Sequence, residues 1–106
     1  MRRHQVIKHI VLWKLKDFAE GSDKTRNAQI MKAELESLKN KIPQIKELEV
    51  GINIIPSDAA FDISLYSAFE SERDLDLYQN HPEHVKVASN IAKLRENRAV
   101  IDYKAG

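Results

Sequence analysis

The segment from residue 4 to residue 16, HQVIKHIVLWKLK, carries apolar side chains on both faces of a predicted β-strand. It is rich in β-branched and aromatic residues and contains no glycine or proline, which is typical of a strand. One face carries Ile7, His9, Val11, Trp13 and Leu15, and the other carries Val6, Ile10 and Leu12. Because successive side chains point to opposite sides, such a strand has to be covered on both sides. This requirement constrains the fold more than any other feature of the sequence.

An amphipathic helix is predicted to follow. The turn at residues 21–23 supplies an N-cap in Asp23, and Pro43 ends the helix. Apolar residues recur between them every three or four positions, which gives one buried stripe. The stripe consists of Ala28, Met31, Leu35, Leu38 and Ile42.

Three more strands are predicted after this helix. Residues 46–54 and residues 61–69 alternate between apolar and polar side chains, as strands with one buried face do. Residues 99–103 form a short apolar run at the end of the chain and predict a last strand.

Two short helices are predicted between the third and the last strand. Ser71 and Asp74 resemble a capping box and start a helix that runs to Asn80. Pro82 starts the next helix, because its fixed φ suits a first turn. The predicted order is β-α-β-β-α-β with the second helix split, which is a ferredoxin-like α+β fold with an antiparallel sheet and helices on one face.

The length and charge of the chain indicate one globular domain. A chain of 106 residues predicts a single domain over residues 1–106. The 17 basic and 16 acidic residues are interleaved, so no patch favours a polyanion or a membrane surface. Cysteine is absent, which excludes disulfides and thiolate metal sites. The charged start lacks the pattern of a signal peptide, and no apolar run is long enough for a membrane span, so the sequence predicts a cytoplasmic protein.

The outer face of the predicted sheet indicates a homodimer. In a monomer this face would meet water, yet Val6, Ile10 and Leu12 lie on it. An apolar sheet face on a small domain marks an association surface. Two such sheets packed face to face would form a dimeric α+β barrel surrounded by helices.

These features together resemble the stress-responsive A/B barrel (Dabb) family. The resemblance extends from IKHIVLWKLKD through FDISLYSAFES and YQNHPEHVKVASNI to VIDY. Its most specific parts are the K-H-x-V-x-W/F-K start and the Y-x-x-H-P-x-H run at Tyr78–His84. The resemblance implies a dimeric α+β barrel, and most members of the family are small proteins without an assigned biochemical role.

One branch of that family is enzymatic. The olivetolic acid cyclase of plants closes a linear polyketide by an aldol condensation without a metal or an organic cofactor. The resemblance maps its acid/base pair to Tyr78 and His84 and its first-strand histidine to His9. This chain has Ile63 where the cyclase has a further histidine, a departure that argues against polyketide cyclisation itself.

Tyr78 and His84 are therefore the candidate catalytic residues. A histidine suits the role of base near neutral pH, and a tyrosine hydroxyl can donate to a developing enolate oxygen. Alternatively, His84 hydrogen-bonds a backbone group beside the apolar stripe of its helix, and Tyr78 fills the core with its hydroxyl at the surface.

His9, Val11, Trp13 and His81 are the candidate ligand-binding residues. His9 shares its strand face with Val11 and Trp13, although a lone histidine on an apolar face is more often a core residue with a hydrogen-bond partner. His81 and His84 have a spacing that could share a metal, but a catalytic zinc site needs a third protein ligand, and the sequence supplies no such set. We expect no metal and no cofactor, and His81 is more simply a residue at a helix start.

An RNA-binding domain has the same order of strands and helices and has to be tested separately. Its third strand should carry glycines and aromatic residues that stack on bases. Here that strand reads FDISLYSAF, without the glycines and with a different aromatic spacing. We therefore predict no nucleic-acid partner. Two functions remain open, a protein that binds a small apolar molecule and a metal-free lyase or cyclase.

Overall fold

The strand that is apolar on both faces lies inside a four-stranded antiparallel sheet. The computed structural model describes residues 5–106, so His4, where the strand was predicted to begin, lies outside the described residues. The sheet consists of β1 (Val6–Leu15), β4 (Glu47–Ile52), β5 (Ile63–Phe69) and β6 (Arg95–Ala105). Its strand order is β4-β5-β1-β6. With the helices between the strands, this confirms the ferredoxin-like β-α-β-β-α-β order.

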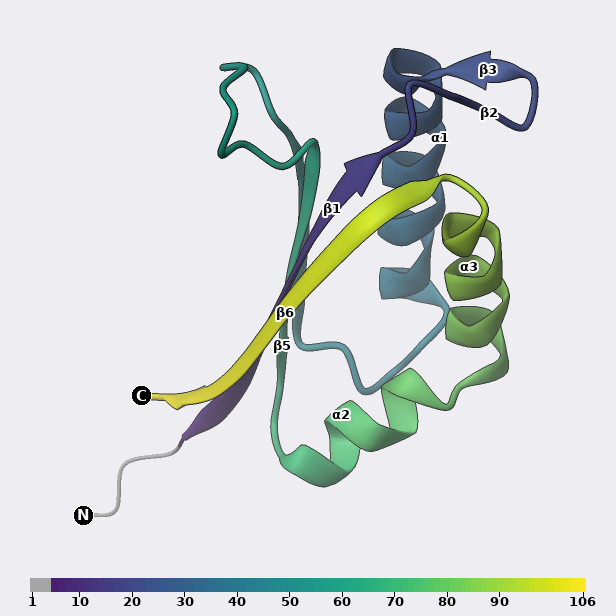
Figure 1. The fold of residues 1–106 in the computed structure, drawn as a ribbon. Helices are drawn as coiled ribbons and strands as arrows, with labels where there is room; N and C mark the ends of the chain where they lie inside the picture. Colours follow the sequence, from purple (N-terminus) through teal and green to yellow (C-terminus); the bar gives the residue numbers. More distant parts are fainter. Residues whose placement is uncertain (1–4) are drawn as a thin grey trace.

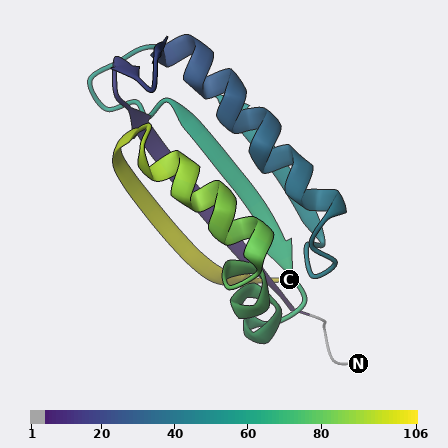
Figure 2. The same cartoon turned by 90° about the vertical axis from the view of Figure 1, so that its right-hand side faces the viewer.

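All helices of the described chain cover the same face of the sheet (Figure 1). They are α1 (Lys24–Ser37), continued by a single 3₁₀ turn η1 (Leu38–Asn40), α2 (Glu72–Gln79) and α3 (Pro82–Ala92). Helices α1 and α3 lie side by side over the sheet (Figure 2). Among residues 5–106, no helix is both long enough and apolar enough to span a membrane.

The helices begin where the capping residues predict. The Asp23 carboxylate accepts a hydrogen bond from the backbone N–H of Arg26 at 2.8 Å. The Ser71 hydroxyl accepts one from the N–H of Asp74 at 3.1 Å. Each side chain satisfies a backbone donor that has no partner within its own helix. The split of the second predicted helix is confirmed.

A short hairpin before α1 was not predicted. Strands β2 (Phe18–Ala19) and β3 (Ser22–Asp23) pair through a two-residue turn at Glu20 and Gly21. Both turn residues have positive φ, 50° and 79°. That conformation matches the twist of a tight hairpin and is accessible to glycine at no steric cost.

The inward face of β1 forms the centre of the hydrophobic core. Its five inward residues, from Ile7 to Leu15, are all buried. They pack with the five apolar residues predicted as the stripe of the first helix, all of which are buried. The helix was predicted to end at Pro43, but α1 ends at Ser37, so Leu38 lies in the 3₁₀ turn and Ile42 follows it. Phe69 on β5 and Tyr78 on α2 are fully buried members of the same core.

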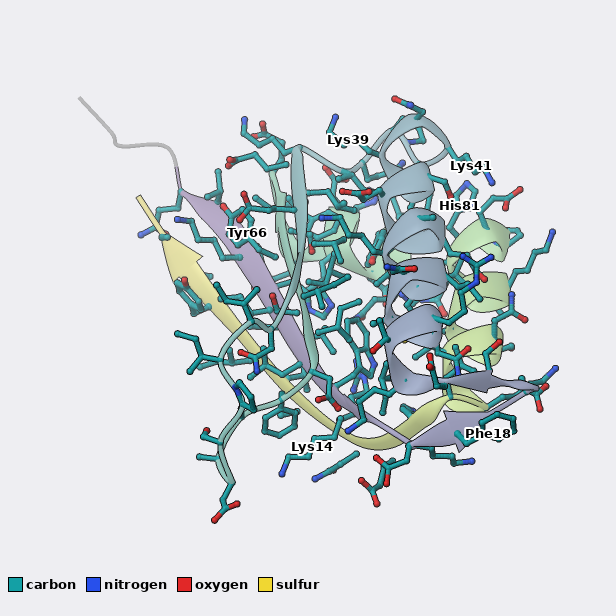
Figure 3. The ribbon with its side chains drawn as sticks, turned by 90° about the horizontal axis from the view of Figure 1, so that it is seen from above. Lys14, Phe18, Lys39, Lys41, Tyr66 and His81 are labelled. Carbon is teal, nitrogen blue, oxygen red and sulfur yellow. The ribbon has the colours of Figure 1, made fainter. Side chains whose placement is uncertain are left out.

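Among residues 5–106, no helix covers the outward face of the sheet (Figure 1). Tyr66 and Lys14, labelled in Figure 3, lie on this side, away from α1 and α3. The pairing of β1 with β6 places Ile101 opposite Ile10 and Ala99 opposite Leu12 on the same face. The radius of gyration, 14.5 Å, exceeds the roughly 13 Å expected of a compact chain of this length. The described chain therefore has the shape of one sheet with one layer of helices.

Strand β6 is longer than predicted. It extends from Arg95 to Ala105, whereas the sequence predicted residues 99–103. Pairing with β1 holds the polar residues at its start in the sheet, with a bulge between Lys14 and Leu15. This backbone pairing outweighs the weak strand propensity of the segment.

Candidate functional site

A cavity of about 200 Å³ lies between the sheet and the helices. It is lined by His9, Val11 and Trp13 of β1, Leu35 of α1, Leu65 of β5, Tyr78 of α2, His84, Val87, Ala88 and Ile91 of α3, and Arg95 and Arg98 of β6. Five of the six residues predicted for the site are therefore brought together. His81 is the exception.

Tyr78 is at the centre of the polar side of this cavity. It lies near the end of α2, and its side chain is fully buried. Its ring centroid is 4.9 Å from that of Phe69, 4.5 Å from that of His84 and 6.2 Å from that of His9. The break between α2 and α3 turns the chain back, so that His84 reaches Tyr78 across it. The fold thus brings Tyr78 and His84, the two candidate catalytic residues, together in one cavity.

The Tyr78 hydroxyl is buried and has no hydrogen-bond partner among the described residues. Burial raises the pKa of this hydroxyl, with the charge of Arg98 opposing the shift. The group therefore stays protonated and can donate a hydrogen bond. Leaving a buried polar group without a partner costs about 1–3 kcal/mol, so a group of this kind calls for an explanation.

One ring nitrogen of His84 is hydrogen-bonded, and the other has no hydrogen-bond partner among the described residues. Its Nδ1 lies 3.0 Å from the backbone carbonyl oxygen of Gln79. A carbonyl only accepts, so Nδ1 carries the hydrogen and Nε2 is the basic nitrogen of the neutral ring. Burial lowers the pKa of His84, and the Gln79 carbonyl opposes this shift. His84 is therefore suited to act as a neutral acceptor or base near neutral pH.

His9 is the second buried imidazole of the site. It is 2% exposed, and its Nδ1 contacts the carboxylate of Asp102, the residue directly opposite on β6. The carboxylate accepts from Nδ1, which fixes the orientation of the ring and leaves Nε2 as the nitrogen available to the cavity. His9 thus has the partner that a buried polar residue needs, and it also lines the cavity.

His81 lies outside the cavity lining. It is the N-cap of α3, where its Nδ1 accepts a hydrogen bond from the N–H of Glu83 at 3.1 Å. Figure 3 shows it at the helix side of the molecule. The structure gives His81 a helix-capping position, and its binding role stays a prediction. Among residues 5–106, no three His, Asp or Glu side chains are grouped so as to hold a metal ion.

Sequence reasoning missed Asp102, Arg95 and Arg98. All three lie on β6, and the predicted last strand began only after Arg98. The signal that could have found Asp102 and Arg98 is alternation: pairing β1 with β6 puts Asp102 opposite His9 and Arg98 opposite Trp13, on the helix-covered face.

Residues 7–105 match the family model of the Stress responsive A/B Barrel Domain. The chain belongs to this family. A curated relative, a stress-response A/B barrel domain-containing protein of Arabidopsis thaliana, is 34% identical over an alignment of 90 residues, which covers 78% of this chain and 30% of the relative. This A/B barrel chain thus spans about a third of the length of that relative.

Two solved structures show the same fold. A dimeric protein of unknown function with a ferredoxin-like fold, from Bacteroides fragilis, is 38% identical, with a TM-score of 0.83 over 94% of this chain and 96% of that one. A hydroxynitrile lyase from Passiflora edulis is 23% identical, with a TM-score of 0.80 over 98% of this chain and 96% of that one. At 23% identity, the likeness to the lyase shows the fold alone.

Replacing Tyr78 by phenylalanine tests whether its hydroxyl lacks a protein partner. The change keeps the ring and removes only the oxygen, so we expect Tyr78→Phe to stabilise this A/B barrel domain by about 1–3 kcal/mol. Chemical denaturation at fixed protein concentration measures the change. Tyr66→Phe is the contrast, because it removes a hydroxyl that donates to the Glu47 carboxylate at 3.3 Å and should not stabilise the domain. A loss of stability in Tyr78→Phe would show that the hydroxyl has a protein partner after all.

The pH dependence of stability tests the environment of His84. Because burial lowers its pKa in the folded state, the unfolded chain takes up the proton first as the pH falls. We expect wild-type protein to lose stability as the pH falls through about 6.5, the ordinary pKa of histidine. In His84→Asn, whose amide can still donate to the Gln79 carbonyl, this loss should be smaller. Equal pH profiles of the free energy of unfolding would contradict the assignment.

Proposed function

We propose that this A/B barrel protein binds a small, largely apolar molecule in the cavity between its sheet and its helices. The observation that carries the proposal is the buried Tyr78 hydroxyl, which lines the cavity and has no hydrogen-bond partner in the described chain. A bound molecule with an oxygen or nitrogen acceptor would satisfy it. The free Nε2 atoms of His9 and His84 offer such a molecule further hydrogen bonds.

The size and the lining of the cavity support a ligand of about one ring. An engineered apolar cavity of about 150 Å³ holds benzene, and this cavity measures about 200 Å³. Apolar side chains make up much of its wall: Val11, Trp13, Leu35, Leu65, Val87 and Ile91. Apolar walls with a few convergent polar groups are what small-molecule sites have in general.

Filling the cavity should abolish binding. Ala88 lines the cavity from α3 and is exposed at its mouth, whereas Ala92 on the same helix is exposed but does not line it. We expect benzyl alcohol, which has one ring and one hydroxyl, to change the fluorescence of Trp13, the only tryptophan in the chain. Ala88→Phe should weaken this binding at least tenfold and Ala92→Phe should not. Binding that survives in both variants would place the ligand elsewhere.

The protein is proposed to work as a homodimer through the outward face of its sheet. The relative from Bacteroides fragilis is dimeric, and this chain leaves Ile101 and Tyr103 exposed on that face. A second copy covering the sheet would complete the barrel.

A charge at the centre of this face should separate the subunits. Ile10→Glu puts a carboxylate opposite Ile101, where burial against a second sheet would be costly. We expect wild-type protein to be a dimer at micromolar concentration and Ile10→Glu to be monomeric or unfolded. Gln29→Glu adds the same charge on the exposed side of α1 and should leave the dimer intact. Light scattering that finds a folded wild-type monomer would overturn the proposal.

A metal-free lyase is the second candidate function. It is favoured by the ring contact between Tyr78 and His84, at 4.5 Å between centroids, in the cavity between the sheet and the helices. His84 would take a proton from the substrate at Nε2, and the Tyr78 hydroxyl would donate to the oxygen on which negative charge develops.

Turnover of a hydroxynitrile separates this candidate from simple binding. The Passiflora edulis neighbour is a hydroxynitrile lyase, so an aromatic hydroxynitrile is the natural probe. In this reaction His84 removes the hydroxyl proton and the bond to the cyanide carbon breaks, which gives the carbonyl compound and cyanide. The cyanide then takes the proton back from His84 and leaves as hydrogen cyanide, so the base is regenerated. If the chain is such a lyase, His84→Asn should lower the rate about 100-fold or more. Release of the aldehyde at the uncatalysed rate by wild-type protein would exclude this activity.

A further inference from the structure

The cavity opens toward solvent between α3 and the start of β6, where two arginines line it. Arg95 and Arg98 are both exposed, and both belong to the cavity lining. Arg98 on β6 is paired with Trp13 on β1, so both side chains leave the backbone on the helix-covered face of the sheet. The two guanidinium groups thus lie at the mouth of a cavity with a largely apolar wall.

Among the described residues, no acidic side chain lines this cavity, so its formal charge is positive. The carboxylate of Asp102, which lies on β6 but outside the cavity lining, accepts a hydrogen bond from His9. Within residues 5–106, neither Arg95 nor Arg98 forms an ion pair, while the lysines at positions 24, 32, 41, 46 and 104 each have a carboxylate within 4.0 Å. These two arginines, at the cavity mouth, therefore keep their charges without a counter-ion in the described chain.

The charge of Arg98 reaches the polar groups of the site. Burial is the main cause of the raised pKa of Tyr78 and of the lowered pKa of His84, and in both groups the charge of Arg98 acts to lower the pKa. Arg98 and Tyr78 line the same cavity, so an anion held there by Arg98 shares that cavity with the Tyr78 hydroxyl.

From this arrangement we infer that the ligand of the cavity carries an anionic group, of which a carboxylate is the simplest, and that Arg98 binds it at the mouth. The inference rests on the proposed binding function and adds the chemical class of the ligand. The apolar part would pack on Trp13, Val87 and Ile91, while the guanidinium fork of Arg98 would hold both carboxylate oxygens. The Tyr78 hydroxyl is available for a further hydrogen bond to the same end of the ligand.

Phenylacetate and its neutral amide, phenylacetamide, provide the test. They share the ring and the methylene group and differ in charge, and neither absorbs where Trp13 is excited. We expect phenylacetate to bind wild-type protein at least tenfold more tightly than phenylacetamide, measured by Trp13 fluorescence. In Arg98→Gln this preference should disappear. Arg73→Gln, which removes the same charge from the exposed side of α2, should retain it.

Each other outcome contradicts the inference in a defined way. If both compounds bind wild-type protein equally well, the cavity is a binding site but not one for anions. If Arg98→Gln keeps the preference and remains folded by its melting temperature, Arg98 is not the anion-binding residue. If neither compound binds while benzyl alcohol does, the anionic class is wrong and the proposed function stands. If neither these two compounds nor benzyl alcohol binds, both the anionic class and the proposed binding function are wrong.

Discussion

Side chains alternate along β1 so that apolar residues lie on both faces of this strand. Because the strand is apolar on both sides, it needs a layer of helices on one side and a second layer on the other. The helices supply the first layer, and the inward residues of β1 become the floor of the cavity. The outward residues form the middle of a sheet face that the chain itself leaves uncovered. The candidate site and the proposed dimer surface are thus opposite faces of one strand.

The break between α2 and α3 brings the two candidate catalytic rings together. Pro82 cannot continue α2, and His81 caps the new helix instead. The chain therefore changes direction between Tyr78 and His84, and the two rings meet at the end of the cavity. A continuous helix would have placed residues six positions apart on different sides. This arrangement leaves the Tyr78 hydroxyl buried without a hydrogen-bond partner in the described chain. Such a cost to stability is expected of a group whose role is to bind a ligand.

Much of this could be predicted from the sequence, because local rules decide it. The two faces of β1, the stripe of α1, the caps at Asp23 and Ser71 and the helix start at Pro82 all follow from periodicity and capping. The meeting of Tyr78 and His84 was predicted through the family resemblance, since spacing alone leaves their orientation open. The start of β6 could not be predicted in this way. Its residues, Arg95 to Arg98, are polar and owe their extended conformation to pairing with a strand some 80 positions earlier. Arg98 was missed for that reason, and Asp102 was missed because its pairing with His9 depends on the same register.

Both proposed functions require the cavity beneath α3 to bind a small molecule whose polar end hydrogen-bonds the Tyr78 hydroxyl. A crystal structure of the protein grown with phenylacetate tests this requirement most directly. We expect electron density for the compound between Trp13 and α3, with a carboxylate oxygen within about 3.2 Å of the Tyr78 hydroxyl. A cavity closed by its own side chains, with the Tyr78 hydroxyl bonded to another group of the protein, would contradict it.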